Sequence, residues 1–225
     1  MMPFYVPPEQ LVKDRADFAR KGVARGRPII VLRLLPGILL IGENSSPSLR
    51  KIGEVYDRIA FAGVGRFNEF ETLRVAGVRY ADLKGYTYAR RDVTGKGLAN
   101  AYSQTLGQIF GHELKPYEVD IVVAEVGDDI GSDKLFRILF DGTLRDADSF
   151  AVLGASEESI AGNVGSSLRD DLSLEEGVRL ACAAIEQAEK REIPASDWEV
   201  AFLDRSSERR AFRRLTVDEL AAARE

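Results

Sequence analysis

Two strand hairpins that flank a pair of helices are the feature that most constrains how this chain can fold. The predicted hairpin strands are residues 29–35, 38–41, 134–140 and 146–153. Pro36-Gly37 and Asp141-Gly142 lie between the paired runs, and such dipeptides are typical of tight turns. Between the hairpins, residues 68–84 and 94–110 have the 3.6-residue apolar period of helices and are too long to be strands. Antiparallel pairs before and after a helical layer predict an α+β fold.

Further elements continue this layered pattern toward the C-terminus. A helix is predicted over residues 156–168, another after Ser173, and a strand over residues 199–203. Three of the helices carry apolar stripes that need a sheet or another helix to cover them. The stripes are Phe67, Phe70, Leu73, Gly77 and Tyr80; Leu98, Tyr102, Thr105 and Ile109; and Leu174, Val178, Ala181, Cys182 and Ile185.

Two capping boxes predict where helices begin. Asn68 with Glu71, and Ser173 with Glu176, have the three-residue spacing at which side chain and backbone can satisfy each other in a first turn. We therefore expect helix starts at Asn68 and Ser173.

The composition predicts one domain in a reducing compartment. The chain has 225 residues, 45% of them hydrophobic, and no flexible linker between Pro28 and Leu203, which favours a single core. Cys182 is the single cysteine, so no internal disulfide is possible and the cytoplasm is the expected setting. The apolar runs are too short for a membrane span, and the uncharged N-terminus lacks the basic start of a signal peptide. No membrane partner is expected.

The charge balance argues against nucleic acid as a partner. The net charge is -5, whereas proteins that bind phosphate backbones usually carry a basic excess. A basic cluster near the C-terminus is interpreted as a solvated or interfacial strand face. Its members are Arg205, Arg209, Arg210, Arg213 and Arg214.

Candidate catalytic and metal-binding residues are few. His112 is the only histidine and stands at a predicted helix end, where a capping or surface role is favoured over a catalytic triad. One histidine and one cysteine exclude a metal site built on these residue types, and no cofactor is expected. Residues 63–65 are interpreted as a tight strand-to-helix turn rather than a dinucleotide-binding loop. Asp128, Asp129 and Asp133 are interpreted as a solvated loop rather than a calcium site.

Several segments spread along the chain carry a family resemblance. They are Ser48-Leu49-Arg50-Lys51-Ile52, Tyr56-Asp57-Arg58-Ile59, Gly65-Arg66-Phe67-Asn68-Glu69-Phe70, residues 85–95, 115–119 and 123–126, and Ala211-Phe212-Arg213-Arg214. Together they resemble the bacterial, actinobacterial branch of the proteasome α-subunit family, from about Pro8 to Leu215. Residues 8–10 and 19–22 differ from the Tyr-Asp and Gln-Val-Glu-Tyr-Ala motifs of archaeal and eukaryotic α-subunits, which favours the bacterial branch.

The resemblance implies a fold and a set of partners. The fold is the four-layer αββα sandwich of N-terminal-nucleophile hydrolases, with two antiparallel sheets. The implied partners are six further copies in a homo-heptameric ring, a ring of catalytic β-subunits, a ring ATPase that docks through its C-terminal tails, and unfolded polypeptides that carried a small ubiquitin-like modifier. The expected segments are a gate tail (1–8), a ring-assembly helix (9–20), the sandwich core (28–215) and a C-terminal helix or tail (216–225).

The sequence shows no N-terminal nucleophile. In this fold the nucleophile is a Thr, Ser or Cys whose own free α-amino group acts as the base. Arg25-Gly26-Arg27-Pro28 precede the first strand, and the first threonine, Thr72, lies on a helix. Gly142-Thr143 has the letters of a processing junction but belongs to a hairpin turn. We expect a non-catalytic subunit, with an active N-terminal-nucleophile amidase and a stand-alone binding protein of the same fold as open alternatives.

The resemblance also implies three functional regions. Lys51 matches the lysine that binds an activator's terminal carboxylate in a pocket between neighbouring subunits, and Gly65 matches the glycine in a turn that lines this pocket, followed by Arg66. Leu11 and Phe18 belong to the apolar face of the expected ring-assembly helix. The expected pore gate comprises Met2, Pro3, Phe4, Tyr5 and Val6.

Overall fold

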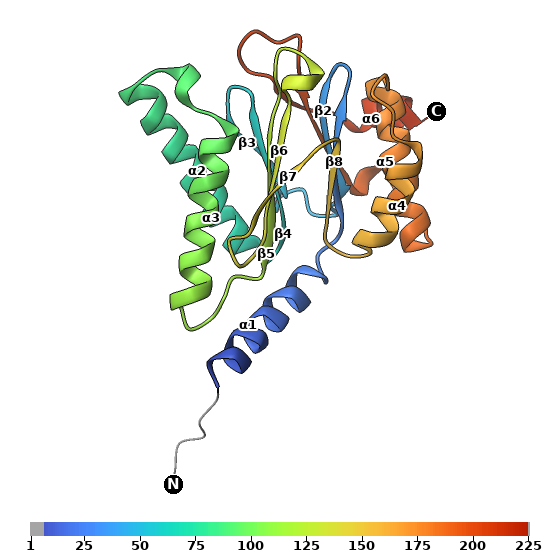
Figure 1. Ribbon diagram of the computed structural model, residues 1–225. Helices are drawn as coiled ribbons and strands as arrows, with labels where there is room; N and C mark the ends of the chain where they lie inside the picture. Colours follow the sequence, from blue (N-terminus) through green and yellow to red (C-terminus); the bar gives the residue numbers. More distant parts are fainter. Residues whose placement is uncertain (1–6, 225) are drawn as a thin grey trace.

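Ten strands and six α-helices make up the part of the chain that the computed structural model describes, residues 7–224 (Figure 1). The strands are β1 (Ile29–Leu34), β2 (Gly37–Glu43), β3 (Ile52–Tyr56), β4 (Ile59–Gly65), β5 (Val119–Glu125), β6 (Lys134–Ile138), β7 (Leu144–Ala147), β8 (Phe150–Leu153), β9 (Trp198–Asp204) and β10 (Phe212–Arg214). The helices are α1 (Pro8–Val23), α2 (Phe67–Thr87), α3 (Gly95–His112), α4 (Glu157–Ser167), α5 (Leu174–Glu189) and α6 (Val217–Arg224), with short 3-10 turns η1 (Arg90–Asp92), η2 (Ile130–Ser132) and η3 (Ala195–Asp197). None of these helices is long and apolar enough to cross a membrane.

The strands form two five-stranded antiparallel sheets that lie between two helical layers. The first sheet has the order β10-β9-β2-β1-β8, and the second has the order β3-β4-β5-β6-β7. Helices α4, α5 and α6 cover the outer face of the first sheet, and α2 and α3 cover the second (Figure 1). The predicted α+β class and the αββα layering are therefore confirmed.

Strand β1 shows how one strand contributes to two cores. Ile30 and Leu32 point toward the helical layer of α4 and α5, whereas Ile29 and Val31 point into the space between the sheets. Because both faces of the strand are buried, its sequence is almost continuously apolar instead of alternating.

The second predicted hairpin is only partly correct. Strands β6 and β7 pair as expected, but residues 146–153 do not form one strand. The run breaks at Asp148-Ser149, and β8 continues in the other sheet, beside β1. The backbone N–H of Arg33 donates to the Ser149 carbonyl at 2.9 Å and so holds the crossing segment to β1. Because both halves of the run favour strand, their local pattern does not reveal the change of sheet.

The two predicted capping boxes have different outcomes. In α5 the Ser173 hydroxyl accepts from the Glu176 backbone N–H at 3.2 Å, and the Glu176 carboxylate accepts from the Ser173 N–H at 2.8 Å, which confirms the prediction. The box at Asn68 is wrong, because α2 begins one residue earlier and has no side-chain cap. Glu71 instead forms an ion pair with Arg74 at 2.6 Å, one turn along the helix.

The faces that α2 and α3 bury also differ in part from the predicted stripes. Tyr80 and Thr105 are exposed and Ile109 is half-buried, while Ala81 and Leu106 are fully buried. The last turns of α2 lie to the side of the sheet, away from it (Figure 1), and the aromatic residues there are exposed. The third stripe is confirmed along α5, where only Leu174, at the first position, is not fully buried.

Helix α1 projects from one end of the sandwich, and its second half is fixed to the core (Figure 1). Ala19 and Val23 are buried. The Arg15 guanidinium donates to the Glu113 carbonyl at 2.6 Å and to the Ile109 carbonyl at 3.3 Å, at the C-terminal end of α3. The Ile109 carbonyl also accepts from the Glu113 backbone N–H at 3.0 Å, so Arg15 adds a second donor where α3 ends. The angle between α1 and α3 is thus set within one subunit.

Candidate docking and assembly sites

Lys51 reaches from the second sheet to the first. Its Nζ donates to the backbone carbonyls of Glu43 at 3.0 Å and Arg27 at 3.4 Å. Burial, and next the charge of Arg27, lower the pKa of Lys51 to about 8, although Glu199 and Glu43 favour its ammonium form. Both hydrogen-bond partners are neutral carbonyls, so a third N–H group of the ammonium is available to an anion.

Two buried carboxylates flank Lys51. Glu43 ends β2 and Glu199 belongs to β9; the strand register places Glu43 opposite Trp198 and Glu199 opposite Gly42, so the two carboxylates lie on opposite faces of the first sheet. Glu43 binds Arg27 and Arg191, whereas Glu199 binds Arg214. The cations of the cluster are Arg27, Lys51, Arg191 and Arg214. Arg191 also lies 3.9 Å from the Glu189 carboxylate, so four cations face three carboxylates. Among these four cations, Lys51 is the one whose side chain binds carbonyls rather than a carboxylate, which favours an anionic ligand there.

Gly65 is the last residue of β4 and Arg66 follows it, and the two residues contact different neighbours. An added Cβ at Gly26 would meet the Gly65 nitrogen at 3.1 Å, and Gly26 directly precedes Arg27, whose carbonyl binds Lys51. Segment 26–27 therefore connects Gly65 with Lys51. The Arg66 guanidinium instead lies 3.4 Å from the Glu118 carboxylate, beside the C-terminal end of α1.

The backbone at Gly65 requires a residue without Cβ. Its φ is +107°, and an added Cβ would lie 1.8 Å from the Glu118 carbonyl oxygen. We expect Gly65→Ala to reduce stability by about 2 kcal/mol or more, which corresponds to a fall in melting temperature of about 4–8 °C.

A matched glycine provides the control for this prediction. Gly162 lies inside α4, and nothing lies within 4 Å of an added Cβ there. Gly162→Ala should raise stability by about 1 kcal/mol, because alanine is the better helix former. Thermal unfolding of both variants checks the contrast, and equal melting temperatures would contradict the strain assigned to Gly65.

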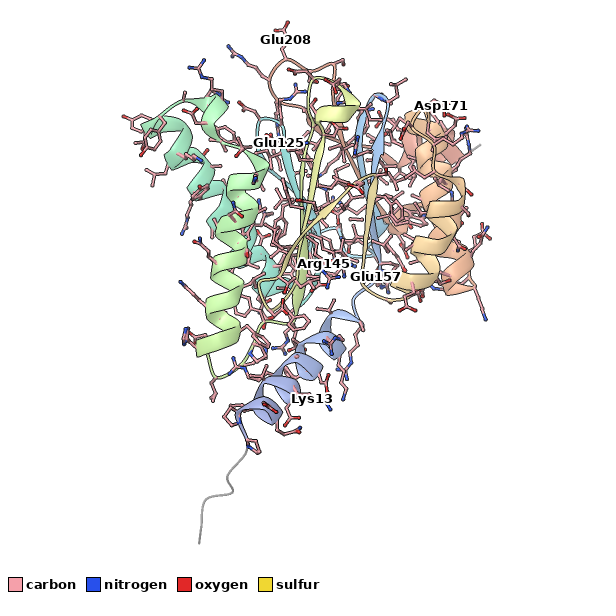
Figure 2. All side chains as sticks on the ribbon, viewed as in Figure 1. Lys13, Glu125, Arg145, Glu157, Asp171 and Glu208 are labelled. Atoms are coloured by element: carbon pink, nitrogen blue, oxygen red, sulfur yellow. The ribbon has the colours of Figure 1, made fainter. Side chains whose placement is uncertain are left out.

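The exposed face of α1 carries both predicted assembly residues. Leu11 is 52% exposed and Phe18 is 47% exposed, while Lys115 Nζ lies 5.7 Å from the centre of the Phe18 ring. Seven residues separate Leu11 and Phe18, so both lie on one face of the helix. Lys13, labelled in Figure 2, is exposed; it follows Leu11 by two residues, or about 200° around the helix, so it lies on the opposite face of α1. Val12 adds further exposed apolar surface, so a single subunit leaves an apolar strip uncovered.

A second exposed apolar patch lies at the far end of α2, and sequence reasoning missed it. Leu83 is 68% exposed and Tyr86 is 91% exposed. Tyr80, Leu83 and Tyr88 line a hollow of about 350 Å³. The available signal was the three tyrosines at and just after the end of this helix, since Tyr86 and Tyr88 fall outside its predicted apolar stripe. We name Tyr80, Leu83, Tyr86 and Tyr88 the aromatic end of α2.

The start of β1 is joined directly to α1 by residues 24–28. The Gly26 carbonyl accepts from Ala155 at 2.8 Å, which holds this connection in place. A nucleophile of this fold needs a free α-amino group at the start of the first strand, and here a peptide bond occupies that position. Gly142 lies in the β6–β7 turn with φ +85°, as the hairpin prediction requires. His112 is exposed as the last residue of α3.

The interpretation of the aspartate loop is wrong for Asp133. This carboxylate is buried, because it accepts from Arg205 at 2.6 and 2.8 Å and from the Gly127 backbone N–H at 2.8 Å. Arg205 belongs to the C-terminal basic cluster, so one salt bridge joins the two features. Other members of the cluster form the ion pairs Arg210–Glu54, Arg213–Glu219 and Arg214–Glu199. Within residues 7–224, no group of His, Cys, Asp or Glu side chains could hold a metal ion.

Comparison with known proteins identifies the family of this sandwich. A family model described as proteasome subunit matches residues 25–203. The chain belongs to the proteasome subunit family. It is 54% identical over 225 residues to the proteasome subunit alpha of Arthrobacter sp. (strain FB24), covering 97% of this chain and 96% of the relative. It is 56% identical over 219 residues to that of Nocardioides sp., covering 95% of this chain and 86% of the relative.

These relatives place the proteasome subunit in the α-type branch. The proteasome subunit alpha of Thermobifida fusca is 53% identical over 222 residues, covering 98% of this chain and 89% of the relative. The resemblance to α-type proteasome subunits of actinobacteria is therefore confirmed, and this class is generally non-catalytic. The predicted gate residues, Met2 to Val6, lie outside the described residues.

Proposed function

We propose that this chain is the non-catalytic subunit that forms the heptameric outer ring of a bacterial proteasome core. The observation that carries the proposal is the continuous chain from α1 into β1, at the position where a catalytic subunit of this fold needs a free amino terminus. In such a particle the catalytic threonine belongs to the β-subunit. The work of this chain is then assembly, gating and docking in the cytoplasm, with no nucleic-acid or membrane partner.

Two apolar surfaces support contacts with two kinds of neighbour. The strip with Leu11 and Phe18 is proposed to pack on the next copy in the ring, since a heterologous interface needs an exposed patch that does not face itself. The aromatic end of α2 lies at the other end of the molecule from α1 (Figure 1) and is proposed to contact the β-subunit ring. Aromatic side chains are enriched at such interfaces because they bury much area with few rotatable bonds.

The half-buried Lys51 ammonium is proposed as the docking site for a ring ATPase that delivers proteins tagged with a small ubiquitin-like modifier. A partly desolvated ammonium with a free N–H group suits a terminal carboxylate. Gly65 allows close approach of a partner's backbone, and the Arg66 guanidinium, which pairs with Glu118, is proposed to contact the partner farther from Lys51. Substrates pass as unfolded polypeptides through the ring.

Removal of the apolar tail tests the gate. If residues 1–6 close the axial pore, deleting them should raise the hydrolysis of short fluorogenic peptides by the reconstituted α/β particle several-fold. The deletion leaves the β-subunit active sites unchanged. Particles with the full-length chain and particles with the shortened chain should therefore hydrolyse peptides at equal rates once the ATPase has opened both. Unchanged basal turnover in the deletion variant would remove the gating role.

The depressed pKa of Lys51 predicts how docking depends on pH. The ammonium is the form that binds a carboxylate, and it loses its proton as the pH rises through about 8. Docking should therefore weaken about tenfold per site between pH 7 and pH 9, at constant ionic strength. Lys51→Arg stays charged over this window, so its weaker docking should be independent of pH. An identical pH profile for both proteins would assign the titration to another group.

Native mass measurement with and without the β-subunit of the same organism tests the proposed function as a whole. A particle that contains seven copies of this chain per ring, together with β-subunits, is the expected result. If this chain stays monomeric at micromolar concentration in the presence of the β-subunit, the result would favour a stand-alone binding protein. A purified chain with a new N-terminal Thr, Ser or Cys and amidase activity would overturn the non-catalytic assignment.

A further inference from the structure

We propose that Glu199 is a positioning residue for docking, because it holds the backbone of Lys51 in place and supplies the negative charge that keeps its side chain an ammonium. The inference rests on the proposed function of Lys51 and extends it to a residue 148 positions away in the chain. Glu199 belongs to β9 in the first sheet, whereas Lys51 directly precedes β3 of the second sheet.

The Glu199 carboxylate accepts four hydrogen bonds, two of them from backbone N–H groups at the start of β3. Oε2 accepts from the Lys51 backbone N–H at 2.9 Å and from Asn44 Nδ2 at 2.6 Å. Oε1 accepts from the Ile52 backbone N–H at 3.2 Å and from Arg214 Nη1 at 2.8 Å. Two consecutive backbone N–H groups on one carboxylate fix the position and the direction in which the Lys51 side chain leaves the strand.

The burial of Glu199 makes this arrangement specific to a carboxylate. The residue is 2% exposed, and a buried charge is tolerated only when charged and polar donors surround it. All four of its donors are N–H groups. A glutamine has one carbonyl oxygen, so its amide group would face two donors in either orientation. The isosteric neutral residue therefore cannot reproduce the contacts.

The electrostatic part follows from the charges that face Lys51. The charge of Arg27 lowers the pKa of Lys51, whereas the charges of Glu199 and Glu43 raise it. Glu43 shares its charge with Arg27 and Arg191, both of which bind it directly, and Glu199 shares its charge with Arg214. Loss of the Glu199 charge should therefore lower the pKa of Lys51 further, and loss of the Arg214 charge should raise it.

The test compares three variants of the full-length chain in the assembled particle: Glu199→Gln, Arg214→Gln and Asp133→Asn. Asp133 is a matched control, since it is also a buried carboxylate bound to an arginine and to a backbone N–H. It binds Arg205, which contacts the Leu34 carbonyl at the end of β1, far from Arg27 before its start. Competitive labelling with acetic anhydride, followed by mass spectrometry, gives the titration midpoint of Lys51 in each variant.

The expected result is a pair of opposite shifts. The Lys51 midpoint should fall by about one pH unit in Glu199→Gln, rise in Arg214→Gln, and stay near the native value in Asp133→Asn. Docking of the ATPase at pH 7.5 should weaken on the order of threefold per site in Glu199→Gln from the lost protonation alone. If Glu199→Gln does not fold, the Lys51 midpoint in Arg214→Gln still tests the electrostatic role of Glu199. The Arg214 side chain is partly exposed, so this variant is expected to fold.

Two outcomes overturn different statements. The first outcome is an unchanged Lys51 midpoint in both Glu199→Gln and Arg214→Gln, while Lys51→Ala still fails to dock. This result would overturn the positioning role of Glu199 and keep Lys51 as the docking site. Normal docking by Lys51→Ala removes the proposed docking site itself. Because the labelling is read without the ATPase, the first statement is tested even when the second fails.

Discussion

Lys51→Ala is expected to abolish ATPase-dependent degradation of folded proteins while the particle still assembles and cleaves short peptides. The lost contact strands a terminal carboxylate in partly desolvated surroundings, at a cost of about 2–5 kcal/mol per site. Several tails dock at once, so the loss is multiplied by avidity. Lys51→Arg should rescue docking in part, because a planar guanidinium fits the site differently from a compact ammonium.

The fold itself should tolerate this substitution. The Lys51 ammonium binds two backbone carbonyls, while Glu43 keeps Arg27 and Arg191, and Glu199 keeps Arg214. No buried carboxylate of the cluster thus loses its arginine partner. Lys96→Ala, on the exposed start of α3, removes the same charge and should leave docking unchanged. Co-purification of the ATPase and degradation of a tagged protein are the measurements, and normal values for Lys51→Ala would place the pocket elsewhere.

The double variant Leu11→Asp, Phe18→Asp is expected to remain a folded monomer and to form no rings. Complete burial of a Leu or Phe side chain is worth about 1.5–3 kcal/mol, and each of these residues keeps about half of its surface exposed in a single subunit. Two carboxylates in a dry interface add a desolvation penalty. An aspartate at position 18 lies near Lys115, so the monomer can accommodate the new charge.

The control for ring assembly is an aspartate on the other face of the same helix. Lys13→Asp introduces the same residue opposite Leu11 and Phe18, and rings should form. Sedimentation velocity gives the size of the particles, and circular dichroism confirms that each monomer is folded. Ring-sized particles from the double variant would show that α1 does not carry the interface.

The layered fold could be predicted because each signal for it is local. Turn dipeptides fix the hairpins at Pro36-Gly37 and Asp141-Gly142, and helical periods fix α2 and α3. The crossing at Asp148-Ser149 could not be predicted, because strand propensity continues through it and only pairing with β1 separates β8 from β7. Tyr80 was predicted to be buried but is exposed, for a similar reason. Which turns of α2 lie against the sheet is a property of the assembled fold and not of the local sequence.

The surroundings of Lys51 were also outside the reach of the sequence. The resemblance points to Lys51 and Gly65, but Glu199 becomes a neighbour of Lys51 only through the antiparallel pairing of β2 with β9. Similarly, Asp133 pairs with Arg205, which lies 72 residues away in the sequence. Charged residues that look solvated in a sequence are buried here because distant strands bring their counter-charges to them.

The bond from Arg15 to the end of α3 has a consequence for the geometry of a closed assembly. A ring closes only when the rotation between successive copies, repeated around the axis, returns to the start. Arg15 fixes the direction of α1 by two hydrogen bonds to Glu113 and Ile109, before any neighbour is present. The helix is therefore preorganised, and association does not have to restrict its orientation. In the proposed ring, the turning angle between copies is in this way encoded in each separate subunit.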